Sequence, residues 1–102
     1  MQHYKVRITA TAFRDIDRIA DYHLMRVGPN SAETITDKLL DTISLLADSP
    51  FLGTLHSDPF LAERDYRKLL CKDYVCIYRV VDDTVFVYRV VNGRMDYPKL
   101  LY

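Results

Sequence analysis

The residues best suited to chemistry lie in the last third of the chain, in the basic and aromatic stretch 66–97. Arg67 is near the start of this stretch, and Arg94 and Tyr97 close it. A guanidinium group can hold two phosphate oxygens at once, and a tyrosine can stack on a nucleic-acid base or help to transfer a proton. Arg67, Arg94 and Tyr97 are therefore the candidate catalytic residues, and they can act without a metal or another cofactor.

Three strands are predicted in this stretch, at residues 66–71, 74–81 and 84–91. Each is rich in β-branched and aromatic residues, and polar two-residue turns separate them. The two later strands lack a clean alternation of polar and apolar residues, so we expect both of their faces to be largely covered. Another short strand is predicted over residues 4–9, where apolar and polar residues alternate.

Two helices are predicted between the first strand and the strand block. Apolar residues recur at helical spacing over residues 11–27. Gly28-Pro29 ends this helix, because glycine accepts the left-handed C-terminal conformation and proline cannot continue a helix. A second apolar stripe covers residues 31–47. So short a connection predicts an antiparallel hairpin, whose charged residues, Asp15 among them, form a solvated face.

These elements predict an α+β fold of the order β-α-α-β-β-β, in which the helical hairpin packs on one face of a mainly antiparallel four-stranded sheet. The length of 102 residues leaves room for one domain, residues 1–102. Residues 51–65 show no clear period. Their apolar side chains indicate a loop that covers an edge of the core, with a short helical turn near residues 60–63.

The composition limits the partners and cofactors. The chain has 14 Lys and Arg and 14 Asp and Glu residues, so its net charge gives no long-range attraction to nucleic acid. Cys71 and Cys76 are predicted to be diagonal neighbours on adjacent strands, at or beyond disulfide reach, and we expect both to be reduced core residues. The three histidines show no metal-ligand spacing, so no metal site is predicted.

The chain starts without the basic and apolar regions of a signal peptide. Its longest apolar run, residues 74–78, is far shorter than the roughly 20 residues of a membrane helix. We therefore expect a cytoplasmic protein with no membrane contact.

Several short motifs follow one another along the chain. A Ser-Pro-x-x-Gly passage lies at residues 49–53, the phrase Tyr-Arg-Val-Val occurs at 78–81 and again at 88–91, and an Arg-x-Asp-Tyr motif lies at 94–97. Together with the opening strand and the helical hairpin, the order and spacing of these motifs resemble the RelE/ParE family of toxins from bacterial toxin-antitoxin systems. The resemblance covers nearly the whole chain.

This resemblance implies a toxin of a type II system that a cognate antitoxin neutralises within a toxin-antitoxin hetero-oligomer. A ParE-like toxin would inhibit growth by binding a target such as DNA gyrase. The alternative is a RelE-like mRNA interferase, a ribosome-dependent endonuclease in which Arg94 would bind phosphate and Tyr97 would stack on a base or help to transfer a proton. A third possibility is a family member that keeps only the antitoxin-binding fold.

The match to the RNases of the family is incomplete. In those RNases a basic residue follows the tyrosine that opens the middle strand, whereas Val75 follows Tyr74 here. Their first strand of the block offers two lysines on one face, whereas Arg67 and Lys68 are adjacent and must point to opposite faces. These differences and the neutral net charge favour the ParE-like interpretation.

The two Tyr-Arg-Val-Val phrases place Arg79 and Arg89 on neighbouring strands. A two-residue turn at Asp82-Asp83 would set Arg79 opposite Phe86 and Arg89 opposite Cys76, on opposite faces of the sheet. A one-residue bulge would bring both onto one face, where they could form a joint anion site. We favour structural roles, in which each arginine pairs with a helix carboxylate or extends its head group to solvent.

Overall fold

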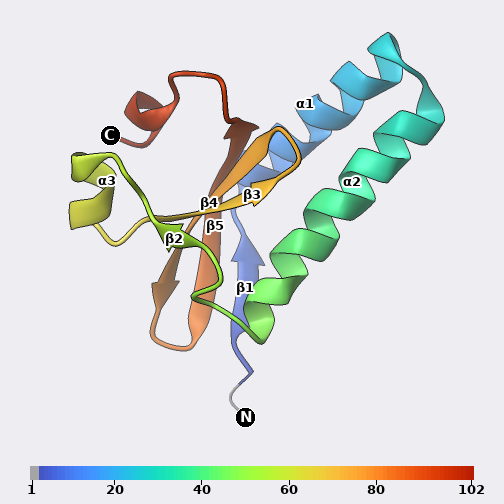
Figure 1. Ribbon diagram of the computed structural model, residues 1–102. Coiled ribbons are helices and arrows are strands. Elements are labelled where there is room, and N and C mark those ends of the chain that lie inside the picture. The colour runs from blue at the N-terminus through green and yellow to red at the C-terminus, as the bar shows by residue number, and fades with distance from the viewer. Residues whose placement is uncertain (1–2) are drawn as a thin grey trace.

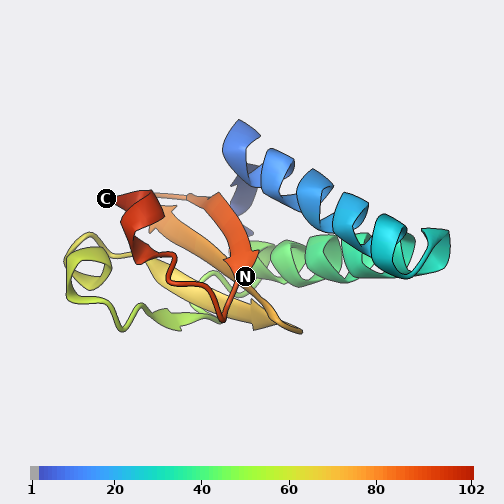
Figure 2. The same ribbon diagram turned by 90° about the horizontal axis from the view of Figure 1, so that it is seen from above.

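The computed structural model describes residues 3–102. A helical hairpin packs against one face of a five-stranded sheet, and a short helix and the C-terminal segment lie against the other face (Figures 1 and 2). The elements in chain order are β1 (Lys5–Ile8), α1 (Ala10–Arg26), α2 (Pro29–Ser44), a 3₁₀ turn (Leu45–Ala47), β2 (Thr54–Leu55), α3 (Pro59–Glu63), β3 (Arg67–Cys71), β4 (Tyr74–Val81), β5 (Thr84–Asn92) and a C-terminal 3₁₀ turn (Pro98–Leu101).

The strands are arranged in the order β1-β5-β4-β3-β2, with β1 parallel to β5 and the other pairs antiparallel. The predicted α+β class, the hairpin and the three-strand block are confirmed. The predicted number of four strands is wrong, because β2 adds a fifth by pairing Thr54 with Lys68 and Leu55 with Arg67. A strand of two residues is too short to show the period-two pattern by which strands are recognised in a sequence.

Local chemistry sets the limits of the two long helices. The Thr9 side chain accepts a hydrogen bond from the Ala12 N–H at 3.1 Å and caps α1. The carbonyl of His23 accepts from the Gly28 N–H at 3.0 Å at the other end, and Gly28 has a φ of 145°. Helix α2 then begins at Pro29, two residues earlier than predicted, because the first helical position needs no N–H donor. In the described part of the chain, no helix combines the length and apolar character that a membrane span requires.

The central strand β4 separates two hydrophobic clusters. Residues 74–78 are all buried. Tyr78 belongs to the cluster between the sheet and the helical hairpin, together with Leu39 of α2. Ile77 belongs to the cluster on the opposite face, beneath Leu61 of α3 and Tyr97. The expectation that both faces of the central strands are largely covered is therefore confirmed.

The register confirms the predicted relation of the two cysteines. Cys71 pairs with Tyr74 and Cys76 with Leu69, and both thiols are free and buried. Burial raises the pKa of the Cys76 thiol to about 12, so the reactive thiolate form is suppressed near neutral pH.

The segment between α2 and β3 covers the core with fewer apolar residues than expected. The predicted helical turn is present as α3, which Asp58 caps by accepting a hydrogen bond from the Leu61 N–H at 3.1 Å. Leu61 is fully buried, whereas Phe51, Leu52 and Leu55 each keep about half of their surface exposed.

Replacement of Val87 by Ala should lower the free energy of unfolding by about 1 to 4 kcal/mol, because Val87 is completely buried and the smaller side chain leaves a cavity. The buried Ile43 should respond similarly. Val27→Ala is a matched control, since Val27 is 74% exposed. Urea unfolding midpoints measure the difference, and an unchanged midpoint for Val87→Ala would mean that the faces of β5 are wrongly assigned.

Candidate functional site

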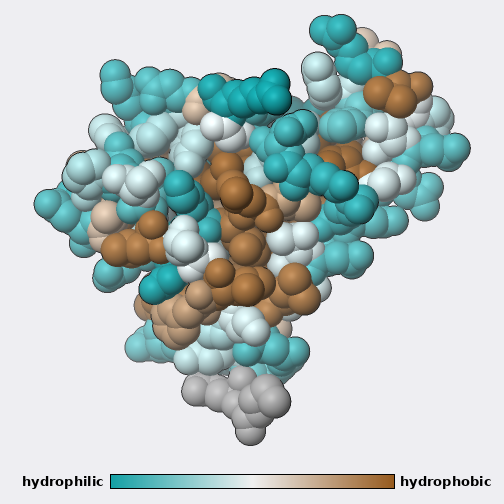
Figure 3. Space-filling view, in the orientation of Figure 1, coloured by the Kyte–Doolittle hydropathy of each residue, from teal (hydrophilic) through white to brown (hydrophobic). Residues whose placement is uncertain are grey.

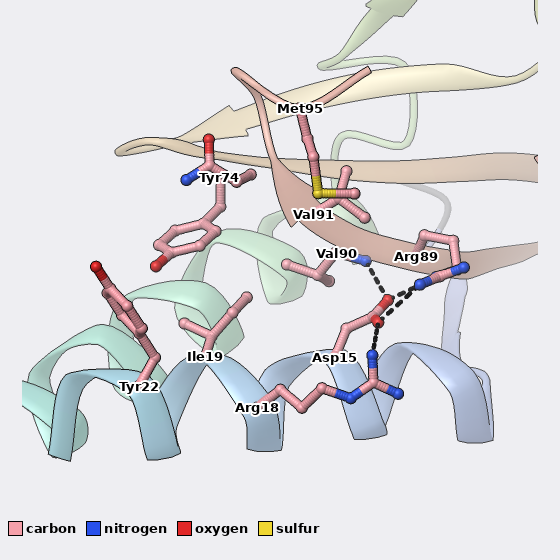
Figure 4. Close-up of a pocket in the computed structure, with 10 residues that line it drawn as sticks. Asp15, Arg18, Ile19, Tyr22, Tyr74, Arg89, Val90, Val91 and Met95 are labelled. Carbon is pink, nitrogen blue, oxygen red and sulfur yellow. Dashed lines mark hydrogen bonds and ion pairs between the residues drawn. The ribbon is translucent and has the colours of Figure 1, made fainter. Parts of the chain in front are cut away.

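A cleft of about 380 Å³ lies between α1 and the end of β5. Figure 4 shows that charged side chains, Asp15, Arg18 and Arg89, meet at one end of the cleft, whereas Tyr22 and Tyr74 lie at the other and Met95 lies between them beside Val91. The complete lining is Asp15, Arg18, Ile19, Tyr22, Tyr74, Arg89, Val90, Val91, Asn92 and Met95. The arrangement suits a ligand group that has an apolar body and a hydrogen-bond-accepting end.

Asp15 holds the charged end together. Its carboxylate accepts hydrogen bonds from Nε and Nη2 of Arg89 at 2.8 and 3.0 Å and from the Val90 N–H at 2.9 Å. Arg18 lies 4.0 Å away from the same carboxylate and is 70% exposed. Because two guanidinium groups share one carboxylate, this end of the cleft carries a net positive charge. The exposed Arg18 therefore keeps donors for an incoming acceptor.

The prediction that Asp15 belongs to the solvated face of α1 is wrong. Only 4% of its surface is exposed, because its carboxylate binds the edge of β5 instead of water. The helical spacing from Ala12 through Asp15 to Ile19 places these residues on one buried face. That spacing is the signal that could have identified Asp15 from the sequence.

A β-bulge directs Arg89 toward Asp15. The ladder between β4 and β5 shifts between Ile77 and Tyr78, so that Arg79 is opposite Phe86 as expected, whereas Arg89 is opposite Ile77. The alternative with a bulge therefore holds. The joint anion site that it made possible does not form with Arg89, because Asp15 already occupies that guanidinium group.

Tyr74, which lines the apolar end of the cleft, is bound to His23 of α1. The His23 Nε2 atom lies 3.0 Å from the Tyr74 hydroxyl, and its Nδ1 atom lies 3.0 Å from the Ser31 hydroxyl. Burial, and then the proximity of Tyr22 and Asp73, raises the pKa of Tyr74. His23 is a partly buried residue with a hydroxyl group within hydrogen-bond distance of each ring nitrogen.

Arg67 is bound to the protein itself. It lies on β3 opposite Tyr78, its Nη1 atom donates to the Gly53 carbonyl at 2.8 Å, and its guanidinium group lies 4.9 Å from the centre of the Phe51 ring. Lys68 is the next residue along β3 and points to the opposite face. Its Nζ atom lies 3.4 Å from the Ser57 hydroxyl.

Tyr97 is buried and bound to a histidine that the sequence did not identify as part of the site. The Asp58 N–H donates to Nδ1 of His56 at 3.0 Å, so in the neutral ring Nε2 carries the proton. Nε2 lies 2.7 Å from the Tyr97 hydroxyl. Burial, and then the charge of Lys68, lowers the pKa of His56. Burial also raises the pKa of Tyr97, so at neutral pH two uncharged groups meet here.

Arg94 is exposed in the loop that follows β5. Its backbone N–H donates to the Asn92 side-chain oxygen at 2.9 Å, which shapes the turn. Asn92 and Met95 both line the cleft, so the Arg94 loop forms part of the rim.

The three candidate catalytic residues lie in different places: Arg67 is in β3, whereas Arg94 and Tyr97 follow β5. Arg67 is opposite Tyr78 of β4, whereas Asn92, just before Arg94, is opposite Tyr74. Four residues along a strand span about 13 Å. Tyr97 is buried beneath the C-terminal segment, beside His56. His56 and Asp15 are the polar residues of these sites that the sequence analysis did not identify.

Two solved structures define the class of the fold. The chromosomal ParDE TA system from P. aeruginosa contains a similar chain, with a TM-score of 0.77 and 18% identity over 88% of this chain and 96% of that chain. The toxin-antitoxin complex RelBE2 from Mycobacterium tuberculosis contains another, with a TM-score of 0.60 and 24% identity over 88% of this chain and 98% of that one. The helical hairpin on one side of the sheet is thus the RelE/ParE fold.

The sequence assigns the family within this class. The family described as the ParE toxin of type II toxin-antitoxin system, parDE, matches residues 6–97. The chain therefore belongs to the ParE toxin family. No curated protein matches the chain in sequence.

Asp15→Asn should reduce the free energy of unfolding by about 3 kcal/mol, because the Arg89 guanidinium would remain largely buried without a counter-charge. Asp17→Asn on the exposed side of α1 should change it by less than about 0.5 kcal/mol. Chemical denaturation of both variants tests this. Equal stabilities would show that the ion pair does not hold α1 to β5.

Acidification should weaken the attachment of the C-terminal segment through His56. The pKa of His56 is lowered in the folded protein, so the unfolded chain binds the proton more tightly. The free energy of unfolding should therefore decrease as the pH falls below about 6.5, the ordinary pKa of histidine. His56→Gln should remove that part of the pH dependence. Urea unfolding of both proteins between about pH 5 and pH 8 measures it, and parallel profiles would contradict the role of His56.

Proposed function

We propose that this ParE-family toxin inhibits growth by binding a macromolecular target, with DNA gyrase as the first candidate, and that a cognate antitoxin neutralises it. The observation that carries the proposal is the separation of the side chains that could cleave RNA. Arg67 donates to a backbone carbonyl, Tyr97 is buried against His56, and Arg94 alone of the three is exposed.

The separation of these side chains supports the proposal, because metal-free RNA cleavage needs several groups at one place. The groups that activate the nucleophile, bind the phosphate and protonate the leaving oxygen must all reach one phosphodiester. Val75 is buried at the position where the RNases of the family place a basic residue. These features support target binding over cleavage.

The surface proposed for the target is the rim of the cleft together with the Arg94 loop. Arg94 and Arg18 are exposed cations, and Tyr22 and Met95 are each at least half exposed beside them. Arginine, tyrosine and methionine are enriched at protein interfaces, where they combine large contact areas with directional hydrogen bonds.

Exposed apolar surface supports an antitoxin partner. Figure 3 shows hydrophobic side chains gathered over the middle of the face that carries β2 and β3. Among the exposed residues of these segments are Phe51, Leu52, Leu55 and Leu70. The tip of the helical hairpin adds Met25 and Val27, which are 85% and 74% exposed. Exposed apolar side chains that are gathered in this way are typical of protein interaction sites. The two similar structures are toxin-antitoxin systems.

Expression without the antitoxin tests the target directly. DNA supercoiling and translation are followed separately after induction, in the cytoplasmic setting that both candidate targets share. Loss of supercoiling before any translation arrest supports gyrase. Early translation arrest with cleaved mRNA would instead establish the endonuclease alternative.

Arg94→Ala should raise the toxin concentration needed for half-maximal growth arrest about tenfold, because the exposed guanidinium is expected to contact the target. Arg79→Ala and Arg89→Ala are the comparison variants, since both arginines lie within strands; Arg79→Ala is the matched one, because Arg89→Ala also breaks the ion pair with Asp15 in the cleft. Circular dichroism confirms that each variant is folded. Full toxicity of Arg94→Ala beside an inactive but folded Arg79→Ala would move the target surface from the loop to the strands.

A further inference from the structure

The repeated Tyr-Arg-Val-Val phrase gives two arginines with different surroundings. Arg89 is neutralised by Asp15 through two hydrogen bonds. Arg79 has no such partner: among residues 3–102 no carboxylate lies within 4.0 Å of its guanidinium group. Its Nε atom is buried and has no hydrogen-bond partner. A half-buried cation without a counter-charge is costly unless a ligand supplies one.

Aromatic rings surround this unpaired cation. The Arg79 guanidinium lies 5.3 Å from the centre of the Tyr66 ring and 5.9 Å from that of Tyr88. The Tyr66 and Tyr88 rings meet edge to face, with their centres 5.4 Å apart. Phe86 lies directly opposite Arg79 on β5. The result is an arginine held in a fixed position by aromatic side chains on the sheet face opposite the helical hairpin.

A second cation shares this face. Lys68 is opposite Ile77, two residues from Arg79 along β4, and alternate residues of a strand face the same side. Its ammonium group contacts only the Ser57 hydroxyl, at 3.4 Å, and makes no ion pair among the described residues. Arg79 and Lys68 are therefore two unneutralised cations on a face that is otherwise aromatic and aliphatic.

We propose that the surface formed by Lys68, Arg79, Phe86 and Tyr88, with the buried Tyr66 ring beside Arg79, binds an acidic peptide segment of a partner protein. A carboxylate of the segment accepts two hydrogen bonds from Arg79, for which planar guanidinium is well suited. Apolar residues of the segment two positions away on either side cover the aromatic rings. Tyrosine and arginine in such a setting are the residues that dominate binding energy in protein interfaces.

Charge favours a peptide over a nucleic acid at this surface. Two cations neutralise only two phosphates, whereas nucleic-acid binding depends on many such contacts. The net charge of the whole chain is zero, so no long-range field supports the binding of a polyanion. The assignment of the acidic segment to the antitoxin rests on the proposed function. The inference that this surface binds an acidic peptide is independent of that function.

The test uses the purified full-length protein and the capped peptide Leu-Ser-Glu-Ser-Leu, with Gln in place of Glu in the control peptide. NMR titration should show that the acidic peptide binds with a Kd on the order of 1 mM. The Arg79 Nε–H signal and the ring signals of Tyr66 and Tyr88 should shift. Arg79→Gln should weaken binding at least about tenfold, since a charged hydrogen-bond pair is lost.

Arg64→Gln is the matched control, because Arg64 also stacks on an aromatic ring, that of Phe60, but already contacts Glu63. Lys68→Gln provides a second variant if Arg79→Gln is unfolded by circular dichroism. Equal binding of the Glu and Gln peptides, no binding of either, or tighter binding of a single-stranded RNA pentamer would overturn the proposal. Growth arrest by the unaltered chain is scored separately, so failure of the toxin assignment is distinguishable from failure of this site.

Discussion

The buried ion pair between Asp15 and Arg89 fixes the relation of the helical hairpin to the sheet. Strand β1 covers the edge of β5 only as far as the pair between Ile8 and Val87. Beyond that point α1 crosses the open edge, and the Asp15 carboxylate takes the Val90 N–H that a neighbouring strand would otherwise accept. The same carboxylate neutralises Arg89, so one residue satisfies both a backbone donor and a buried charge. The cleft exists because this contact holds α1 against the end of β5.

Tyrosine hydroxyls attach the outer segments to this framework. Tyr74 bonds to His23 near the end of α1, Tyr78 bonds to the Gly53 N–H beside β2, and Tyr97 bonds to His56 ahead of α3. Each ring fills apolar space while its hydroxyl satisfies a polar group in a loop or helix, which a phenylalanine could not do. Gly53 must be small for this arrangement, because a Cβ atom there would lie 2.5 Å from the Lys68 carbonyl oxygen.

The parts of the fold that repeat along the chain were predictable from the sequence. Helical and strand periods, together with Gly28-Pro29, gave the hairpin and the three-strand block. The features that were missed depend on single contacts between distant residues. Strand β2 is defined by its pairing with β3, Asp15 is buried by a strand 75 residues further along, and the bulge leaves Tyr88 of β5 without a partner on β4. The pairing of β2 and the bulge leave no periodic signal, and the helical spacing of Asp15 shows only which face of α1 it occupies. The candidate site could be predicted only as a set of reactive residues, not as a geometry.

The arginines of the sheet and of the loop after it form two groups, according to whether the protein itself supplies acceptors for their guanidinium hydrogen bonds. Arg89 and Arg67 donate to a carboxylate and to a carbonyl within the chain, so packing and stability are sufficient to explain them. The guanidinium groups of Arg79 and Arg94 donate to no side-chain or backbone acceptor that the structure records among residues 3–102. Water can satisfy Arg94 in its exposed loop, whereas the Arg79 guanidinium is held beside two tyrosine rings with its Nε buried and unpaired. A partner that brings a carboxylate to the Nη groups of Arg79 would gain a charged hydrogen bond to a side chain that the fold has already ordered.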